Sequence, residues 1–355
     1  MSDNLRLPLD ARSSDYGTCE ETLTMGITDK AVASSVPLIP RPIVRKIASR
    51  YIAGRRLEES LETIQNLNGH GCLATMSVLG ESTQSESAAT EKLEQYRRVV
   101  GALEANDLKS GISVKLTGLG LTLDEDLCRE NLEEIVVYAG EKNRFVRVDM
   151  EDSSYTAATL ELVLDMHERH ENIGAVIQAY LRRSLKDVTR LAEAGVSVRL
   201  CKGIYDEPRE IAYKDFDTIR QNYVLLLEEL IKGGLYVGVA THDEYLVWHA
   251  LRIIHQMGLT KDRYEFQMLL GVDEDLRRIL VNAGHKMRVY VPFGEDWYEY
   301  STRRLRENPK IAGYVAKDVI GSIAKVVKNR RSYGGTNDGT SAVQERTVPG
   351  LVGRV

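Results

Sequence analysis

The fold is decided by three consecutive segments: the β-branched run SVRLC at 197–201, the amphipathic stretch IRQNYVLLLEELIKGG at 219–234, and the run YVGVA at 236–240. Alternation of strand and helix in this order predicts right-handed βαβ units and a parallel sheet. Outward from this unit the rhythm continues, with further strand-like runs at 72–79, 112–116, 145–150, 175–180, 265–269 and 287–291. Eight strands over residues 70–308 leave roughly 30 residues per unit, which is the size of a βαβ repeat.

We therefore predict an α/β protein with a closed (β/α)₈ barrel of the TIM type, whose active site lies at the C-terminal ends of the strands. An open doubly wound sheet is the alternative, but no GxGxxG sequence follows the first strand. Helices are predicted before the barrel, and a final helix over its mouth. The predicted organisation is a polar, mobile segment at 1–36, N-terminal helices at 37–69, the catalytic barrel at 70–326 and a disordered tail at 327–355.

Composition excludes several classes of protein. The 355 residues carry a net charge of -5, which argues against a nucleic-acid binder. No apolar run approaches the length of a membrane span, and the polar N-terminus does not resemble a secretory signal. The cysteines Cys19, Cys72, Cys128 and Cys201 are scattered without a CxxC pair, so neither a disulfide framework nor a zinc site is predicted. We expect a cytoplasmic protein, with a mitochondrial location as the alternative.

Polar residues stand at or near the predicted strand ends, where a bare core would not need them. The set includes Lys115, Asp149, Gln178, Arg199, Lys202, Tyr205, Thr241, His242 and Tyr290. Each one alone is more often a core or rim residue, but together they indicate a ligand-binding barrel mouth. Arg303 with Arg304 suits a carboxylate or a phosphate. Arg199 with Lys202, beside Gly203, suits a phosphate or an electron-rich ring. The adjacent acids after Asp149 point to different faces, so no metal site is predicted.

At these residues the sequence resembles the proline dehydrogenase family, which has a distorted (β/α)₈ barrel. The matching segments occur in order: LGES (79–82), VKL (114–116), VRVDMED (146–152), VIQAYLRRS (176–184), VRLCKGIYDEP (198–208), ATHD (240–243), YEFQMLLG (264–271) and VYVPFGEDWYEYSTRRLREN (289–308). The short chain resembles the monofunctional, FAD-dependent members. The resemblance implies oxidation of L-proline to Δ1-pyrroline-5-carboxylate, the first step of proline catabolism to glutamate, by hydride transfer from C5 to flavin N5.

The resemblance also assigns roles residue by residue. Arg303, Arg304 and Lys115 match the cations that hold the substrate carboxylate, and Glu81 matches an acid that pairs with Arg303. The ring of proline would be lined by Asp149, Tyr205, Leu269 and Tyr290. Arg199 matches a catalytic cation beside flavin N5. The remaining cofactor contacts would be Gln178 at the flavin ring, Lys202, Gly203, Thr241 and His242 at the ribityl and pyrophosphate groups, and Glu307 near the adenosine.

Two positions of the sequence bear on how closely it follows the family pattern. Asp206 stands where some members place an aromatic residue against the adenine, and Tyr290 favours proline over hydroxyproline.

The family implies a membrane quinone as electron acceptor, with peripheral contact at the inner face of a membrane, and coupling to a separate pyrroline-5-carboxylate dehydrogenase. Two other classes stay open: a Schiff-base aldolase that uses Lys115 or Lys202 as nucleophile, and a non-catalytic proline-binding barrel.

Overall fold

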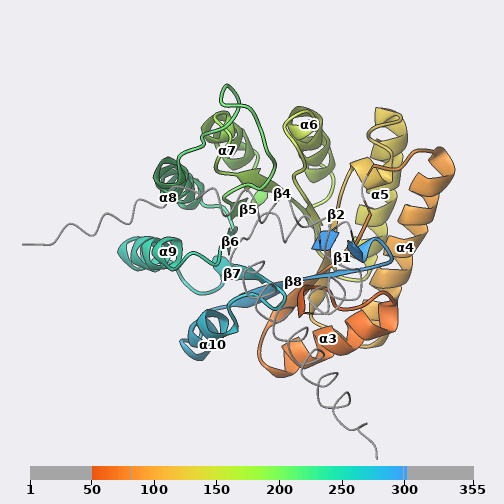
Figure 1. Cartoon of the computed structure of the whole chain (residues 1–355), viewed down its shortest axis with the longest axis horizontal. Coiled ribbons are helices and arrows are strands. Elements are labelled where there is room, and N and C mark those ends of the chain that lie inside the picture. Colours follow the sequence, from red (N-terminus) through yellow and green to blue (C-terminus); the bar gives the residue numbers. More distant parts are fainter. Residues whose placement is uncertain (1–49, 81, 299, 302–355) are drawn as a thin grey trace, which may run out of the picture.

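The architecture is a closed barrel of eight parallel strands surrounded by helices (Figure 1). The computed structural model describes residues 50–80, 82–298 and 300–301. The strands are β1 (Leu73–Val78), β2 (Ser110–Val114), β3 (Val146–Val148), β4 (Ile173–Gln178), β5 (Ser197–Cys201), β6 (Val237–Ala240), β7 (Tyr264–Leu269) and β8 (Met287–Phe293). The helices are α3 (Leu57–Gly69), α4 (Glu86–Ala105), the 3-10 turn η2 (Thr117–Leu119), α5 (Glu125–Glu141), α6 (Thr156–His167), α7 (Ser184–Glu193), α8 (Phe216–Lys232), α9 (Glu244–Gln256) and α10 (Glu274–Asn282).

Closure of the sheet confirms the predicted barrel over the open doubly wound alternative. β1 pairs in parallel with β2 on one side and with β8 on the other, so that Thr75 lies opposite both Gly111 and Tyr290. Every other strand pairs with its neighbours in sequence. Helix α3 precedes the first strand and packs across β1 and β8 (Figure 1).

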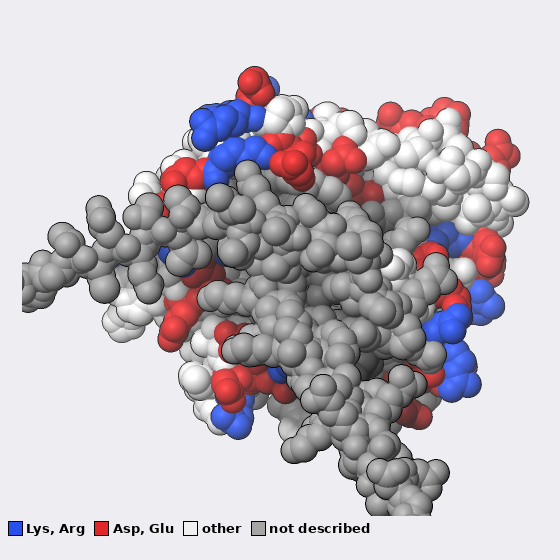
Figure 2. All heavy atoms as spheres, viewed as in Figure 1, with Lys and Arg blue, Asp and Glu red and all other residues white. Residues whose placement is uncertain are grey.

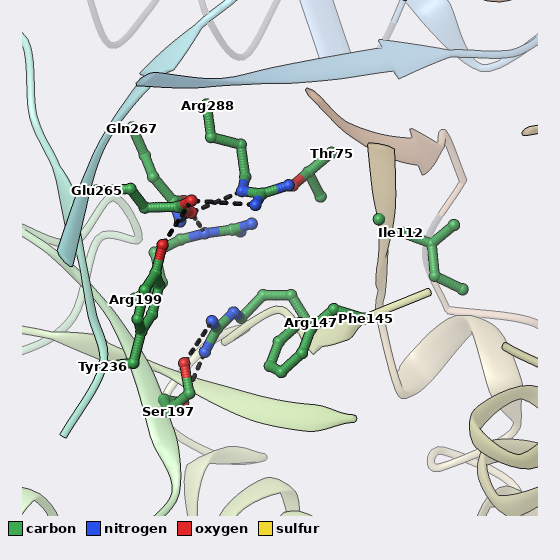
Figure 3. A pocket seen from close by; sticks show the side chains of 11 residues that line it. Thr75, Ile112, Phe145, Arg147, Ser197, Arg199, Tyr236, Glu265, Gln267 and Arg288 are labelled. Atoms are coloured by element: carbon green, nitrogen blue, oxygen red, sulfur yellow. Dashed lines mark hydrogen bonds and ion pairs between the residues drawn. The ribbon is translucent and has the colours of Figure 1, made fainter. Parts of the chain in front are cut away.

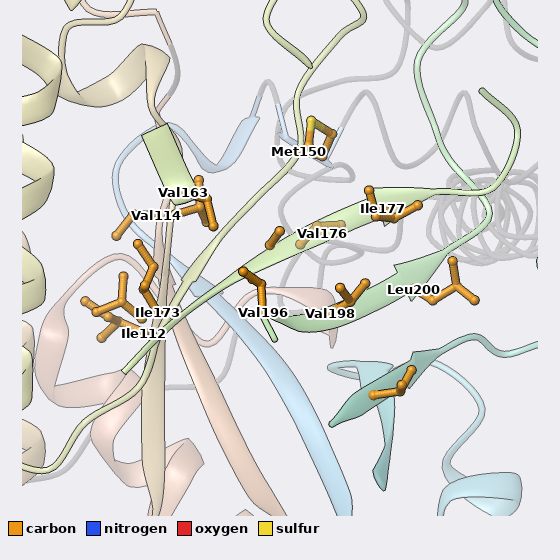
Figure 4. Close-up of a cluster of buried hydrophobic side chains, with 14 of the residues drawn as sticks. Ile112, Val114, Met150, Val163, Ile173, Val176, Ile177, Val196, Val198 and Leu200 are labelled. Carbon is orange, nitrogen blue, oxygen red and sulfur yellow. The ribbon is translucent and has the colours of Figure 1, made fainter. Parts of the chain in front are cut away.

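Side chains alternate between two environments along each strand, because successive residues of a strand point to opposite faces. In β7, Tyr264, Phe266 and Met268 face the surrounding helices and are at most 2% exposed. The main hydrophobic core therefore lies between barrel and helices, and Figure 4 shows part of it around Ile112 and Ile173. The intervening residues Glu265 and Gln267 bond to groups on other strands, which places them inside the barrel.

The strand bounds differ from the sequence-based prediction at two points that concern the site. The third strand was predicted at 145–150, whereas β3 spans Val146–Val148, so Asp149 follows it. β2 was predicted at 112–116, whereas it spans Ser110–Val114, so Lys115 follows the strand instead of lying on it. The strand begins early because Ser110 and Gly111 pair with Ala74 and Thr75 of β1, despite their low intrinsic preference for strands. The predictions for 1–36, for 37–49, for the final helix after 301 and for the tail at 327–355 lie outside the described residues.

The visible surface of the described residues mixes both signs of charge. Figure 2 shows Lys and Arg beside Asp and Glu around the rim of this face. Exposed ion pairs join neighbouring helices, such as Arg190 of α7 with Glu161 of α6 at 2.8 Å. Among the described residues, no helix is both long and apolar enough to cross a membrane.

Candidate active site

One buried carboxylate gathers residues from four strands or strand ends near the C-terminal end of the barrel. Asp149, directly after β3, has its Oδ1 2.7 Å from Arg199 Nη1 of β5. Its Oδ2 accepts a hydrogen bond of 2.7 Å from the Tyr290 hydroxyl of β8, and Lys115 Nζ lies 3.7 Å from the same oxygen. Ser113 Oγ of β2 donates to Oδ1 at 2.6 Å. The four sequence-predicted residues Lys115, Asp149, Arg199 and Tyr290 are thus brought together.

Electrostatic interactions keep the Asp149 carboxylate ionised and the Tyr290 hydroxyl protonated. Burial raises the pKa of Asp149, but the charges of Arg199 and Lys115 and the hydrogen bonds from Ser113 and Tyr290 outweigh burial and hold that pKa below its usual value. Burial, reinforced by the negative charge of Asp149, holds the pKa of Tyr290 well above its usual value. Tyr290 is therefore a neutral donor and Asp149 a charged acceptor.

The cluster carries more positive than negative charge. Lys115 and Arg199 are cations, Asp149 is the single carboxylate among them, and each residue is at most 9% exposed. Arg199 also stacks on the Tyr290 ring, with its guanidinium carbon 5.3 Å from the ring centre. Within the described part of the chain, its Nη2 makes no hydrogen bond. An excess cation in a water-poor setting is suited to an anionic group on a ligand.

A second cluster of predicted residues lies after β5 and β6. Lys202 Nζ contacts Asp243 Oδ2 at 3.1 Å, and Arg220 of α8 holds both oxygens of the same carboxylate at 2.9 Å. Thr241 Oγ1 accepts from the Asp243 backbone N–H at 3.1 Å. Attraction to Lys202 and Arg220 outweighs burial, so the pKa of Asp243 is lowered. Asp243 therefore fixes Lys202 and Arg220 beside one another.

Gly203 occupies a position that only glycine can fill. Its φ is +109°, and a Cβ placed there would lie 2.1 Å from a ring carbon of Tyr180. Any side chain would collide with that ring and strain the backbone. Packing against Tyr180 therefore requires glycine here, and the role of Gly203 in close approach of a ligand stays a prediction.

Two further predicted residues have defined roles within the barrel. His242 Nε2 accepts a hydrogen bond of 2.9 Å from the Leu269 backbone N–H, which ties the end of β6 to the end of β7. Gln178 Nε2 donates to the Glu151 backbone oxygen at 2.9 Å, and its side chain is almost fully buried. Both contacts hold the side chains in one orientation.

The remaining predicted residues are placed less tightly or not at all. Tyr205 and Leu269 are partly buried. Asp206, where the resemblance expects some members to have an aromatic residue, is exposed and contacts Lys214 Nζ at 2.9 Å. The predictions for Glu81, Arg303, Arg304 and Glu307 fall outside the described residues. Among the residues that are described, no group of three His, Cys, Asp or Glu side chains is arranged to hold a metal ion.

Sequence reasoning assigned no role to a charged group at the opposite end. A cavity of about 270 Å³ lies among the first residues of the strands, where Thr75, Arg147, Ser197, Tyr236, Glu265 and Arg288 line it (Figure 3). Arg147 donates to the Ala175 and Ser197 carbonyl oxygens at 2.8 and 2.6 Å. The signal was present in the sequence, since YEFQM and MRVYV alternate polar and apolar residues with the period of a strand.

Fold and site together define a (β/α)₈ barrel with a cation-rich, partly buried mouth, the class in which barrel enzymes bind small anionic substrates. Comparison with known proteins narrows the class. Residues 60–317 match the family model described as proline dehydrogenase, and the chain belongs to that family.

Relatives and solved structures agree with this assignment. The chain is 34% identical over 273 residues to proline dehydrogenase 2 of Bacillus subtilis (strain 168), covering 77% of this chain and 90% of the relative. It is 35% identical over 292 residues to a proline dehydrogenase of Deinococcus radiodurans, covering 80% and 94%. A crystal structure of proline utilization A (PutA) from Bdellovibrio bacteriovorus, inactivated by N-propargylglycine, matches with a TM-score of 0.71 and 27% identity over 74% of this chain. The match spans 33% of that PutA chain.

Proposed function

We propose that this chain oxidises L-proline to Δ1-pyrroline-5-carboxylate, with hydride transfer from C5 of the ring to N5 of a bound FAD. Membership of the proline dehydrogenase family makes proline the substrate and a flavin the implied cofactor. The observation that carries the proposal is the Asp149 cluster, which offers excess positive charge at the C-terminal end of the barrel.

The carboxylate of proline is the handle that this cluster can use. Lys115, together with Arg303 and Arg304, would bind it through charge-assisted hydrogen bonds. Glu81 would pair with Arg303 when the site is filled. Anchoring at the carboxylate fixes the ring against Asp149, Tyr205, Leu269 and Tyr290, so that C5 has one orientation. The aromatic and apolar walls exclude water from the ring.

Features of the described residues fit a flavin nucleotide. Gln178 has its amide nitrogen engaged by Glu151, and its Oε1 makes no hydrogen bond within the described part of the chain, so it suits a ring N–H. The charge of Lys202, held beside Arg220 by Asp243, suits the phosphates of a nucleotide, and Gly203 would contact the ribityl chain. When bound, FAD would supply the hydride acceptor. Arg199 would stabilise negative charge that develops there, while Thr241, His242 and Glu307 would complete the binding of the nucleotide.

The proposal extends to partners. A membrane quinone would reoxidise the cofactor, and a separate pyrroline-5-carboxylate dehydrogenase would consume the product. No nucleic acid is involved, in keeping with the net charge of -5.

The visible spectrum of the purified protein tests the function. We expect a flavin absorption band that is bleached by L-proline in the absence of oxygen. A colourless protein that borohydride traps covalently with a keto substrate would instead establish the Schiff-base aldolase. Proline binding without bleaching would establish the non-catalytic barrel. Both lysines that an aldolase could use are ion-paired, Lys115 with Asp149 and Lys202 with Asp243, whereas a Schiff-base lysine attacks as a neutral amine.

The substitution Arg303→Met tests the role of the pair Arg303 and Arg304. Loss of one charge-assisted contact, worth roughly 1.5–3 kcal/mol, should raise KM for proline about tenfold to a hundredfold while the FAD content stays unchanged. Steady-state kinetics and the flavin-to-protein ratio measure the two quantities. Loss of flavin with an unchanged KM would contradict the assignment.

A further inference from the structure

A buried chain of hydrogen bonds runs from the site to the N-terminal end of the barrel (Figure 3). Arg199 Nε donates to Gln267 Oε1 at 2.6 Å. Gln267 Nε2 donates in turn to Glu265 Oε1 at 2.6 Å. Arg288 holds Glu265 from the other side, through Nε at 2.6 Å and Nη2 at 3.0 Å. None of these contacts is explained by the proposed binding of substrate or cofactor.

Glu265 dictates which way the Gln267 amide faces. Attraction to Arg288, with hydrogen bonds from Arg288, Tyr236 and Gln267, outweighs burial and lowers the pKa of Glu265, so its carboxylate is ionised. An ionised carboxylate only accepts hydrogen bonds, so the amide nitrogen of Gln267 must face it. The amide oxygen then faces Arg199, which needs an acceptor at Nε.

On the side of Arg199 that faces the N-terminal end of the barrel, the hydrogen bond to Gln267 is the contact that holds the side chain. The cavity of about 270 Å³ is lined by both Arg199 and Gln267, so close-packed side chains do not fill that side. Room for the Gln267 amide is made by Gly238 on β6, where an added Cβ would lie 2.3 Å from Gln267 Nε2. The position of Arg199 thus depends on a hydrogen-bonded side chain that itself has only one possible orientation.

We propose that Gln267 and Glu265 are positioning residues, which hold the Arg199 guanidinium at the C-terminal end of the barrel. This inference rests on the proposed function, in which Arg199 stabilises negative charge on the reduced cofactor. Without the acceptor at Nε, the guanidinium would be held by Asp149, Ser113 and the Tyr290 ring, and it would be free to shift toward the cavity. Its charge would then lie farther from the cofactor.

The variant Gln267→Met tests the proposal because it keeps the side-chain length and removes both hydrogen bonds. We expect the rate of flavin bleaching by L-proline to fall about tenfold, with KM for proline changed much less. The midpoint potential of the bound flavin should become more negative by about 30 mV, which is a tenfold change for a two-electron couple. A merely structural role would leave that potential unchanged.

A substitution on β6 disturbs the same Gln267 contact from the neighbouring strand. In Gly238→Ala the new methyl group meets the far end of the Gln267 side chain, which can move, so the barrel should still fold. We expect the same shifts as in Gln267→Met but smaller. The double variant should resemble Gln267→Met, because two changes that act through one contact are not additive. Additive effects would show that the two substitutions do not act through the same Gln267 contact, and would overturn the proposal.

Controls separate this proposal from the function on which it rests. Met268→Leu changes the next residue of β7, which faces the helices, and Gly101→Ala adds a methyl group in α4 that comes no closer than 3.4 Å to its neighbour, Tyr138 Oη. Both should match the wild-type potential and rate. If the wild-type protein carries no flavin or is not bleached by proline, the proposed function fails. If the wild type is bleached but Gln267→Met keeps its potential and rate, only the positioning role is overturned.

Discussion

Two buried carboxylates near the opposite ends of the barrel, Glu265 and Asp149, are paired differently, although Arg147, which donates to backbone carbonyl oxygens, gives the N-terminal end an excess cation as well. At the N-terminal end, Glu265 accepts hydrogen bonds from Arg288, Tyr236 and Gln267, so both of its oxygens are engaged and its charge is matched by Arg288. At the C-terminal end, Asp149 is shared between Arg199 and Lys115, and the cations exceed the carboxylate. The Glu265–Arg288 ion pair, called the closed pair below, has its charges matched and stabilises the fold. The Asp149 cluster has one cation in excess, which suits an anionic ligand. The comparison separates residues that hold the barrel from residues that are proposed to hold the substrate.

The largest expected effect comes from breaking the closed pair. Removing one partner of a buried ion pair leaves the other charge uncompensated, so Glu265→Ala should lower the free energy of unfolding by about 3–5 kcal/mol. Urea unfolding measures the loss. The exposed pair provides the control, since Arg190→Ala should cost less than about 1 kcal/mol. Equal losses of unfolding free energy in Glu265→Ala and Arg190→Ala would contradict the claim that the buried pair contributes more to stability than the surface pair.

A smaller effect is expected at the C-terminal end. Tyr290→Phe removes one hydrogen bond to Asp149 and leaves the other partners in place. A bond to a charged group is worth about 1.5–3 kcal/mol, so we expect a loss near the lower figure in urea unfolding at neutral pH. Tyr245→Phe, on the exposed start of α9, is the matched control and should leave stability unchanged. A loss as large as that of Glu265→Ala would mean that this end, too, is a closed structural pair.

The smallest effect is a shift in acid stability. The pKa of Asp149 is lower in the folded than in the unfolded chain, so its contribution to stability is fully present above the unfolded value and is lost as pH falls through the folded value. Tyr290→Phe removes one of the causes that lower this pKa. Its stability should therefore fall by less than that of the wild type as pH drops from neutral to about 3, measured by urea unfolding at each pH. Parallel acid profiles would show that the Tyr290 hydroxyl does not set this pKa.

Much of this molecule could be predicted from local sequence patterns. The strand runs and their spacing predicted the barrel, because parallel strands buried on their outer face are rich in β-branched and apolar residues. The residues at strand ends predicted the Asp149 cluster. What local patterns did not predict were the partners across the barrel interior, such as Arg199 of β5 with Gln267 of β7. Those contacts depend on closure of the sheet, which brings strands together that are distant in sequence.

The central claim is that excess positive charge at the C-terminal end binds the carboxylate of the substrate, and Lys115 tests it most directly. The measurement is kcat/KM for L-proline and for L-prolinamide, which lacks the carboxylate, in the wild type and in Lys115→Met. The wild type should strongly prefer L-proline, and Lys115→Met should lose about tenfold or more of that preference. An unchanged preference in the variant would contradict the account.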